Sequence, residues 1–381
     1  MAQRLKTDWI LFGTVMALVF FGVVMVYSAS SISAQLDPRY GSSWHFVVRQ
    51  AAWAAVAFGA MMTLKRTYYR KFQNPAVAFG AIGFALLLLV IVYFADGRHR
   101  WLHFGPVSIQ PSEFAKPALV IFLAFFVTWR ARAINNLRYT LLPAALSVGL
   151  LIFAVIVPDL GTAMVLGGAA MAVFFTAGLE WRYCFIVGVM ALLGLVVSVA
   201  VEPYRIARVV RAVDPDYKIL SKVDPHGTIK AHMEKSLATR DTNYQSEQSR
   251  IAVGDGGVLG LGLMKGRQKL MYLPEAHTDF IYAVVGEELG LLGSAGLLAA
   301  FAVIIWRGLR AAIRMQDDFG RYLALGVTMV LALQAFVNMS VVVGMIPTTG
   351  IPLPMISYGG SSLLTTLALL GILMNVAEHA G

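Results

Sequence analysis

The sequence predicts an all-α integral membrane protein that crosses the bilayer many times, and three observations support this fold class. The 381 residues are 58% hydrophobic and only 14% charged, which is far from the averages of soluble globular proteins. Apolar stretches of about 17 to 25 residues, long enough to cross a hydrocarbon core ~30 Å thick, recur along the chain. The basic residues gather in alternate loops, as they do in membrane proteins with a fixed orientation.

Ten apolar stretches can be counted, and an even number places both termini on the same side of the membrane. The predicted spans are residues 9–31, 46–64, 75–94, 113–129, 141–157, 162–179, 183–201, 279–306, 323–345 and 357–378. The chain begins with Arg4 and Lys6 before an apolar run from Trp9 to Val26, which imitates a signal peptide. Because this run is longer than a usual signal-peptide core and many spans follow, an uncleaved first helix is favoured.

The distribution of Lys and Arg predicts that both termini are cytoplasmic. With this orientation the inner segments hold fourteen basic residues: Arg4, Lys6, Lys65, Arg66, Arg70, Lys71, Arg130, Arg132, Arg138, Arg182, Arg307, Arg310, Arg314 and Arg321. The short outer loops hold only Arg39, Arg98 and Arg100. The net charge of +10 is therefore explained by the orientation of the chain in the membrane. Binding to nucleic acid is not indicated, because the sequence has no nucleic-acid motif and no basic patch interleaved with aromatic residues.

The chain is expected to form a single polytopic domain, residues 1–381, with one large outer loop, residues 202–278, between the seventh and eighth spans. The middle of this loop, residues 214–248, is polar and has no apolar period, so it is expected to be mobile or only locally ordered. Before it, Arg205, Arg208 and Arg211 recur every third residue and would line one side of a helix. Such a stripe suits phosphate groups, and a face in contact with solvent or lipid headgroups is an equal alternative.

Two types of bound group have no recognisable site in the sequence. Cys184 is the only cysteine, which excludes an intrachain disulfide, and no Cys/His spacing indicates a structural zinc. The glycine-rich stretch 254–266 lacks Gly-Lys-Ser/Thr, a proper GxGxxG and a preceding strand. A flexible or close-packed re-entrant turn is therefore expected there, and no ATP or dinucleotide site is predicted.

The most informative carboxylate is Asp279, which follows His277 and Thr278 at the outer end of the eighth span. A partly desolvated carboxylate at this interface can act as a general base on a hydroxyl group. The alternative is a helix-capping role, since Thr and Asp both favour helix N-termini. Position alone leaves both open.

Two further carboxylates, Glu287 and Glu288, lie eight and nine residues beyond Asp279, which is about 12 to 13 Å deeper along a helix. They are too deep to share a substrate atom with Asp279. A structural role is expected for both, in a pair with an inward-facing donor or a water molecule. Gly286 and Gly290 form a small-xxx-small pattern, so this helix should pack tightly against another helix.

Other polar groups point to the same outer cavity. Glu113 and Lys116 lie three residues apart at the start of the fourth span, and this spacing predicts an ion pair. The pair can have an architectural or a functional role. Asp159 adds another carboxylate on the outer side. Residues 346–362, which include Ser357, form an outer loop dense in Pro, Gly and hydroxyl groups; irregular backbone at membrane depth is tolerated where it lines a cavity within the protein.

Five stretches resemble the shape, elongation, division and sporulation (SEDS) family of bacterial cell-wall synthesis, whose members include FtsW and RodA. They are QPSEFAKP at 110–117, PDLGT at 158–162, YQSEQSRIAVGDGGVLGLGL at 244–263, LPEAHTDFIYAVVGEELGLLG at 273–293 and GIPLPMISYGGSS at 350–362. They keep the family's order over most of the chain. PEAHTDF and GEELGLLG look closer to the division protein FtsW, whereas GIPLP is common to the elongation protein RodA, so the resemblance leans to FtsW. Residues 214–240 look longer and more charged than is usual in the family.

The resemblance implies a ten-helix peptidoglycan glycosyltransferase that polymerises lipid II at the outer face of the bacterial cytoplasmic membrane. Asp279 matches the family's essential catalytic Asp, which would take a proton from the 4-hydroxyl of the acceptor sugar as that oxygen attacks the donor's anomeric carbon with inversion. Arg205 and Arg208, or a divalent cation such as Mg²⁺ or Mn²⁺, would stabilise the departing pyrophosphate, and no cofactor is certain. The other expected substrate-binding residues are His277, Thr278, Glu113, Lys116, Asp159 and Ser357.

The resemblance also implies partners: a class B penicillin-binding transpeptidase of the FtsI type and other divisome proteins. Two other functions remain open. A transporter of lipid II across the membrane would use the intramembrane carboxylates Glu287 and Glu288 and the segments broken by Gly and Pro. An inactive scaffold that activates a transpeptidase is the third reading. The expected convergence of polar residues at the outer face, away from the midplane, favours the enzyme.

Overall fold

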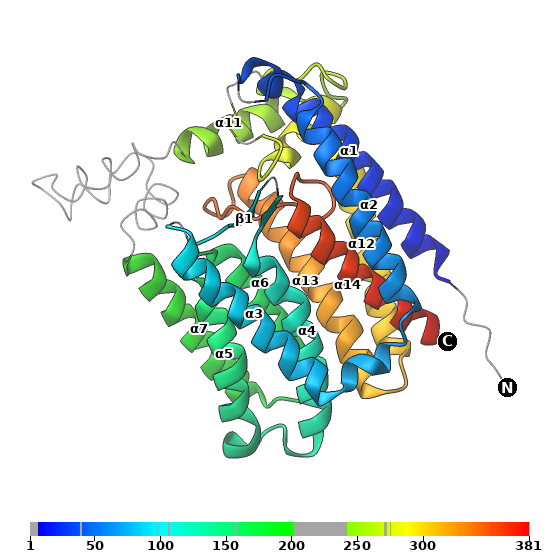
Figure 1. Ribbon diagram of the computed structural model, residues 1–381, viewed down its shortest axis with the longest axis vertical. Coiled ribbons are helices and arrows are strands. Elements are labelled where there is room, and N and C mark those ends of the chain that lie inside the picture. The colour runs from blue at the N-terminus through cyan, green and yellow to red at the C-terminus, as the bar shows by residue number, and fades with distance from the viewer. Residues whose placement is uncertain are drawn as a thin grey trace, which may run out of the picture.

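The computed structural model describes residues 7–38, 40–97, 99–105, 107–156, 158–201, 242–269, 273–274 and 276–380. Almost all of the regular structure in these ranges is α-helical, and Figure 1 shows the helices gathered side by side in one bundle. A short antiparallel hairpin, in which Leu102 pairs with Ile109, is the only sheet among the described residues. The predicted class, an all-α polytopic membrane protein, is confirmed.

The described residues form eleven α-helices. They are α1 (Trp9–Leu36), α2 (His45–Arg66), α3 (Pro75–Ala95), α4 (Pro111–Arg130), α5 (Leu142–Ile156), α6 (Leu160–Thr176), α7 (Trp181–Val201), α11 (Thr242–Asp255), α12 (Ile281–Arg314), α13 (Asp318–Val342) and α14 (Gly360–His379). The hairpin strands are β1 (Leu102–Phe104) and β2 (Val107–Ile109), and the shorter helical turns are η1 (Tyr69–Gln73), η2 (Ala131–Ala133) and η3 (Leu137–Leu141).

Each of the ten predicted spans coincides with one of these helices, with boundaries that differ by a few residues. Eight of the described helices are long and apolar enough to cross a membrane. The other two, α6 and the apolar part of α7, are shorter, so a count of ten spans stays a prediction. A chain with eight such helices is a multi-pass membrane protein.

Helices α13 and α14 lie in the middle of the bundle, and several others face outward. The most apolar window of α13 and that of α14 are each 78% buried, whereas the corresponding windows of α2 and α3 are 17% and 28% buried. The outward faces carry large apolar side chains such as Phe84 and Leu87. This distribution is expected when the surrounding solvent is lipid, because an apolar side chain then needs no protein cover.

The first and last described residues lie at the same end of the bundle, which we call the terminus end (Figure 1). There Lys65 pairs with Glu378 at 2.6 Å, and Arg307 pairs with Asp8 at 2.5 Å. These contacts join α1, α2, α12 and α14. The opposite end, where α12 begins and α11 lies, is called the pocket end.

Helix α12 is interrupted at Gly290, whose backbone angles (φ 63°, ψ −159°) are not helical. The glycine-rich segment 257–262 supplies the hydrogen bonds that the helix loses there. The N–H groups of Leu261 and Gly262 donate to the carbonyls of Glu287 and Glu288 at 3.0 and 2.9 Å, and those of Leu291 and Leu292 donate to the carbonyls of Gly257 and Val258 at 2.9 and 3.2 Å. These bonds give partners to four backbone groups at the break, as a low-dielectric setting favours.

The predicted tight packing against another helix is confirmed at Gly286, where an added Cβ would lie 3.1 Å from Val253 of α11, whereas Gly290 packs on the glycine-rich segment that follows α11. A Cβ added at Gly256 would lie 1.9 Å from the carbonyl oxygen of Gly286. A Cβ added at Gly260 would lie 2.2 Å from the carbonyl oxygen of Glu288. Of the two alternatives for residues 254–266, the close-packed turn is the one the structure shows.

One local expectation differs from the structure. Residues 214–248 were expected to be mobile or only locally ordered, but residues 242–248 form the first half of α11. This polar stretch becomes helical because α11 packs on other helices: Ser249 and Ala252 are fully buried, and the Ser249 hydroxyl donates to the Val342 carbonyl at 3.0 Å. Residues 202–241, including Arg205, Arg208 and Arg211, lie outside the described residues.

Candidate functional site

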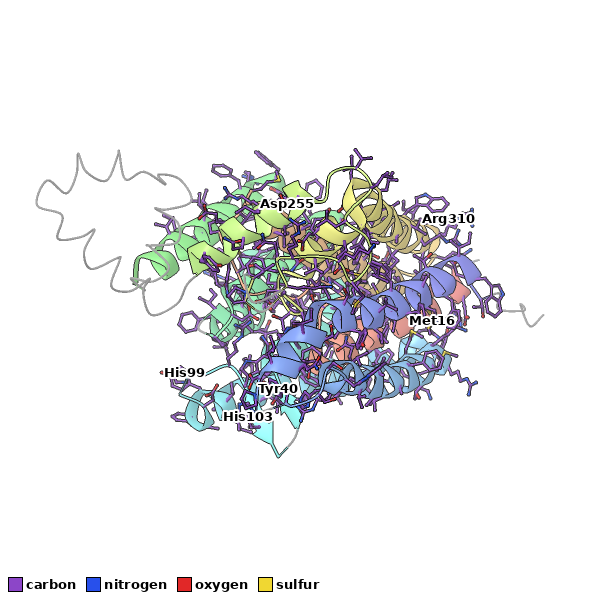
Figure 2. All side chains as sticks on the ribbon, turned by 90° about the horizontal axis from the view of Figure 1, so that it is seen from above. Met16, Tyr40, His99, His103, Asp255 and Arg310 are labelled. Atoms are coloured by element: carbon purple, nitrogen blue, oxygen red, sulfur yellow. The ribbon has the colours of Figure 1, made fainter. Side chains whose placement is uncertain are left out.

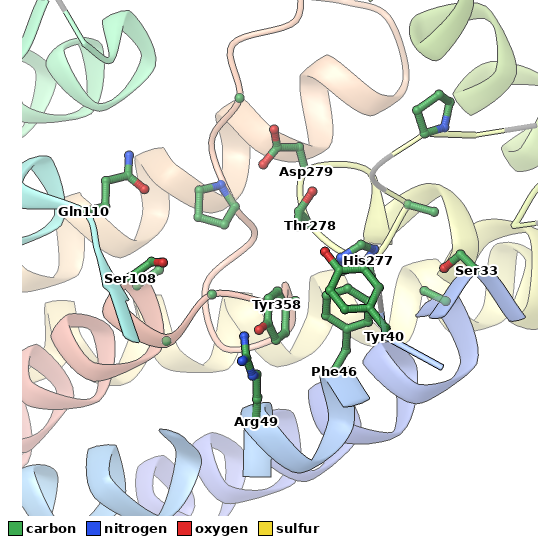
Figure 3. A pocket seen from close by; sticks show the side chains of 18 of the residues that line it. Ser33, Tyr40, Phe46, Arg49, Ser108, Gln110, His277, Thr278, Asp279 and Tyr358 are labelled. Carbon is green, nitrogen blue, oxygen red and sulfur yellow. The ribbon is translucent and has the colours of Figure 1, made fainter. Parts of the chain in front are cut away.

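A cavity of about 780 Å³ lies at the pocket end. Its described walls come from α1, α2, the region of the β-hairpin, the turn before α12, the loop 346–359 and the start of α14. Its lining residues include Arg49, Arg100, Lys269, Asp279 and Tyr358. Segments more than 300 residues apart in the sequence thus meet around one space (Figure 3).

The turn that carries His277, Thr278 and Asp279 is held by its backbone on both sides. The N–H of Tyr358 donates to the carbonyl of His277 at 2.9 Å, and the side chain of Asn338 donates to the carbonyl of Asp279 at 2.8 Å. These contacts tie the turn to the loop 346–359 and to α13. All three residues line the cavity, and Figure 3 shows the Asp279 carboxylate among the lining side chains.

Helix α12 begins at Ile281, two residues later than predicted, so Asp279 belongs to the preceding turn. The N-cap residue is Phe280, and no side chain accepts a hydrogen bond at this cap. Asp279 still lies close to the N-terminus of α12, where the helix dipole favours a negative charge, so both alternatives for this carboxylate stay open.

An aromatic wall supports the same turn. The imidazole of His277 lies 4.4 Å from the Phe46 ring and 5.6 Å from the Tyr358 ring, measured between centroids. The rings of Phe46 and Tyr358 meet edge to face at 5.1 Å, and Tyr40 packs on Phe46 at 5.0 Å (Figure 3). Such ring contacts restrict the orientation of His277 beside Asp279.

The loop 346–359 is irregular, yet four of its carbonyls are satisfied by long polar side chains from other elements. Arg100 donates to Gly350 at 2.7 Å, Asn338 to Ile351 at 2.7 Å, Gln334 to Pro352 at 2.9 Å and Gln50 to Ser357 at 3.2 Å. The loop also lines the cavity through Gly350, Pro352, Tyr358 and Gly359. This agrees with the expectation that irregular backbone is tolerated where it borders a cavity.

Glu113 and Lys116 form the predicted ion pair, with a distance of 2.7 Å between Lys116 Nζ and Glu113 Oε1. Both are fully buried on α4, and neither is among the residues that line the cavity. Lys116 also donates to Gln334 Oε1 at 2.8 Å, and Gln334 in turn holds the Pro352 carbonyl. The pair therefore supports the cavity wall from behind.

Asp159 and Ser357 are likewise placed behind the wall. Asp159 caps α6 by accepting the Thr162 N–H at 2.9 Å, and its other oxygen accepts the side chain of the cavity residue Gln110 at 2.9 Å. The hydroxyl of Ser357 accepts the N–H of Leu353 at 2.8 Å within the loop.

The predicted site residues thus fall into three groups. His277, Thr278 and Asp279 line the cavity; Glu113, Lys116, Asp159 and Ser357 are buried behind it; Arg205 and Arg208 lie outside the described residues. Whether any of them contacts a substrate stays a prediction.

Two arginines in the cavity wall were not predicted, although each left a signal in the sequence. Arg100 is one of the few basic residues in the short outer loops, and Arg49 is a charge in the first turns of an apolar span. Burial raises the pKa of the Tyr358 phenol, while a hydrogen bond from Arg49 and its positive charge act in the opposite direction. Arg49 lines the cavity near Tyr358 (Figure 3).

Glu287 and Glu288 have the structural role that was expected. Glu288, fully buried, accepts Lys269 Nζ at 2.6 Å and the hydroxyl of Ser28 at 2.6 Å. Glu287 accepts the backbone N–H groups of residues 267 and 268 at 2.5 and 3.1 Å. Together Glu287 and Glu288 attach residues 267–269, which include the cavity residue Lys269, to the first turns of α12.

The suggested divalent cation has no evident protein cage in the described part of the chain. No group of three or more His, Cys, Asp or Glu side chains gathers there in a metal-binding arrangement. Mg²⁺ is usually held by one or two carboxylates together with substrate phosphates, so a divalent cation at the pyrophosphate stays a prediction.

Comparison with known proteins gives related chains over nearly the full length. A probable peptidoglycan glycosyltransferase FtsW from Geobacter metallireducens is 39% identical, over 98% of this chain and 95% of that protein. The stage V sporulation protein E of Bacillus subtilis is 36% identical, over 99% of both chains.

Solved structures agree with the fold. A chain from a peptidoglycan synthase complex that coordinates polymerization and crosslinking superposes with a TM-score of 0.73 at 28% identity, over 99% of both chains. The rod shape determining protein RodA of Thermus thermophilus superposes with a TM-score of 0.66 at 27% identity, over 98% of this chain and 97% of that one. The family model FTSW_RODA_SPOVE, described as "Cell cycle protein", matches residues 8–381. The chain belongs to the FtsW/RodA/SpoVE family of cell cycle proteins.

Proposed function

We propose that this protein is a peptidoglycan glycosyltransferase that polymerises lipid II during cell division, with Asp279 as the general base. The observation that carries the proposal is the Asp279 carboxylate in the wall of a cavity of about 780 Å³, on a turn whose backbone is fixed by Tyr358 and Asn338. A cavity of this size accommodates sugar rings. Relatives named as peptidoglycan glycosyltransferases support the same substrate class.

The proposed reaction transfers a glycan between two lipid-linked substrates. Asp279 takes the proton of the acceptor sugar's 4-hydroxyl as that oxygen bonds to the donor's anomeric carbon. The bond between this carbon and the diphosphate oxygen breaks, and its electron pair leaves with the lipid diphosphate. Attack on the side opposite the leaving group inverts the configuration at the carbon. The turn of His277 and Thr278 would position the acceptor hydroxyl, because both line the same cavity.

The proposed setting is the bacterial cytoplasmic membrane, with both termini in the cytoplasm and the cavity at the outer face. The Lys and Arg distribution supports this orientation, and the position of both described ends at one side of the bundle is consistent with it. A class B penicillin-binding transpeptidase of the FtsI type is the proposed partner, and other divisome proteins would join it. The similar chain from a complex that coordinates polymerization and crosslinking supports such a partner.

A lipid II transporter is the second candidate function, and an elongation role of the RodA type is a variant of the first. The transporter would need Glu287 and Glu288 for binding within the membrane. Both carboxylates are fully buried and engaged by Lys269, Ser28 and backbone N–H groups. This arrangement favours the enzyme.

The test compares the native chain with Asp279→Asn in a lipid II polymerisation assay that includes the cognate transpeptidase. Asp255→Asn is the matched control, because Asp255 is an exposed carboxylate on α11 away from the cavity wall (Figure 2). We expect glycan strands from the native and Asp255→Asn proteins, and none from an Asp279→Asn protein whose melting temperature is unchanged. Normal polymerisation by Asp279→Asn would refute the catalytic assignment. Movement of lipid II across liposome membranes without glycan formation would favour the transporter.

A further inference from the structure

Arg100 presents donors to the cavity that the protein itself does not satisfy. Its Nη2 donates to the Gly350 carbonyl at 2.7 Å, while its Nε is buried without an acceptor among the described residues. A guanidinium carries five N–H donors in a fixed fork, and a buried donor without a partner is costly. Arg100 therefore has unused donor capacity at a cavity wall.

Arg100 also lies close to Asp279. A Cβ built on Gly350 would be 3.3 and 3.4 Å from the two Nη atoms of Arg100 and 3.5 Å from Asp279 Oδ2. The guanidinium and the carboxylate therefore flank the same glycine, with no more than about 7 Å between them, as the sum of these distances requires.

Arg49 supplies a second cation to the same cavity from α2. It is exposed and lines the cavity near Tyr358 (Figure 3). Within the described part of the chain, neither Arg49 nor Arg100 forms a salt bridge with a carboxylate. Lys269, the remaining lysine or arginine of the described wall, is neutralised by Glu288 at 2.6 Å. Arg49 and Arg100 are thus the two cations of the described wall that form no salt bridge with a described carboxylate, and the wall also carries the carboxylates Asp37 and Asp279.

We propose that Arg100 and Arg49 form the diphosphate-binding subsite of this cavity, with Arg100 beside the reacting carbon. The inference rests on the proposed glycosyl transfer and adds the residues that receive its leaving group. The guanidinium fork matches the geometry of phosphate oxygens and binds them in pairs. As the carbon–oxygen bond breaks, the electron pair passes to the diphosphate oxygen, and a preorganised cation beside that oxygen stabilises the new charge. Asp279, within about 7 Å, holds the proton of the acceptor hydroxyl.

The ligand is the diphosphate, as opposed to the lipid tail or the sugar. Two phosphates offer more acceptor oxygens than one, so a diphosphate can engage both guanidinium groups whereas a monophosphate engages fewer donors. The subsite should therefore bind undecaprenyl diphosphate more tightly than undecaprenyl monophosphate. Undecaprenol, which has no phosphate, should bind equally well to the native protein and to the arginine variants.

The experiment measures binding of undecaprenyl diphosphate, undecaprenyl monophosphate and undecaprenol to the full chain in detergent. The variants are Arg100→Gln, Arg49→Gln and Asp279→Asn, and Arg138→Gln is the control because Arg138 is exposed and distant from the cavity wall. Loss of hydrogen bonds to a charged ligand predicts diphosphate binding about 10- to 100-fold weaker for Arg100→Gln. Arg49→Gln should weaken binding less, because Arg49 is more exposed. Arg138→Gln should bind nearly as the native chain does, whereas Asp279→Asn, which removes a negative charge within about 7 Å of Arg100, should bind the diphosphate no more weakly than the native chain.

The outcomes separate this inference from the proposed function. Native-like diphosphate binding by both arginine variants would overturn the subsite while leaving a polymerase that depends on Asp279. An equal loss for undecaprenol would assign the effect to the lipid tail and would also overturn it. Normal polymerisation by Asp279→Asn would reject the general base, even if the arginines bind diphosphate. If Arg100→Gln does not fold, two other variants test the subsite in its place. They are Arg49→Gln and Arg100→Lys, which keeps the positive charge but loses the paired guanidinium N–H donors.

Discussion

Replacing Lys269 by methionine should destabilise the protein more than almost any other single change at the pocket end. Lys269 Nζ lies 2.6 Å from Glu288 Oε1 and 3.1 Å from the Ser28 hydroxyl, and both charged side chains are almost completely buried. Methionine fills most of the lysine volume but leaves the Glu288 carboxylate without a counter-charge. Glu288 would retain only the hydroxyl of Ser28 and the N–H of Met264 as donors.

The size of the effect follows from the burial. Removal of one partner of a buried ion pair costs about 3 to 5 kcal/mol, because the remaining charge is uncompensated, whereas removal of both is often neutral. We therefore expect Lys269→Met to lower the free energy of unfolding by about 3 to 5 kcal/mol. In the double variant Lys269→Met/Glu288→Gln, the amide oxygen can still accept from Ser28 and Met264, so the free energy of unfolding should return to within about 1 kcal/mol of the native value.

The assay is reversible unfolding in mixed micelles with increasing denaturing detergent, followed by circular dichroism. Lys265→Met is the control, since Lys265 is an exposed cation of the same segment and its loss should change stability by less than about 0.5 kcal/mol. If Lys269→Met were as stable as the control, the ion pair would not hold the segment to α12. A double variant as unstable as the single one would show that the lost stability came from packing rather than from charge.

Two further changes test the packing around the cavity by the same unfolding assay. Gly256→Ala should lower the free energy of unfolding by about 3 kcal/mol or more, because the added Cβ would lie 1.9 Å from the backbone oxygen of Gly286. The control Gly254→Ala, whose Cβ would meet no atom within 4 Å, should be neutral or stabilising. Equal stability of the two variants would contradict the close packing. Asp159→Ala should cost about 2 to 4 kcal/mol, because it removes the cap at Thr162 and an acceptor for buried side chains, while Asp159→Asn, which keeps an oxygen at the cap, should cost less.

The helices were predictable because lipid imposes a simple rule on the sequence. A span must be apolar over a fixed length and must satisfy its own backbone, so α3 was expected at residues 75–94 and is found at Pro75–Ala95. This rule does not predict helices that are buried by contacts with other parts of the protein. The polar α11 packs through Ser249 and Ala252, which local sequence could not reveal. The break at Gly290 was also missed, since its hydrogen bonds come from a segment about thirty residues earlier.

The site was predictable where chemistry is concentrated in a short motif. Asp279 with His277 and Thr278 was identified from adjacent residues, and all three line the cavity. Residues that join the wall through tertiary contacts were harder to predict: Arg49 and Arg100 share a cavity with Asp279 only because α2, the hairpin region and the loop 346–359 converge. Sequence distance hid this convergence, although an arginine in a short outer loop was itself a signal.

The packing of α2 against α14 has a consequence for biogenesis. Gln50, fully buried on α2, donates to Ser357, 307 residues later, and a Cβ on Gly371 of α14 would lie 2.4 Å from the Met61 carbonyl of α2 (Figure 1). A nascent chain therefore holds the polar Gln50 in the membrane without its final partner until translation has passed Ser357. The cavity wall that Tyr358 completes cannot exist before that moment, so a stalled ribosome or an early stop codon yields inserted helices without a site.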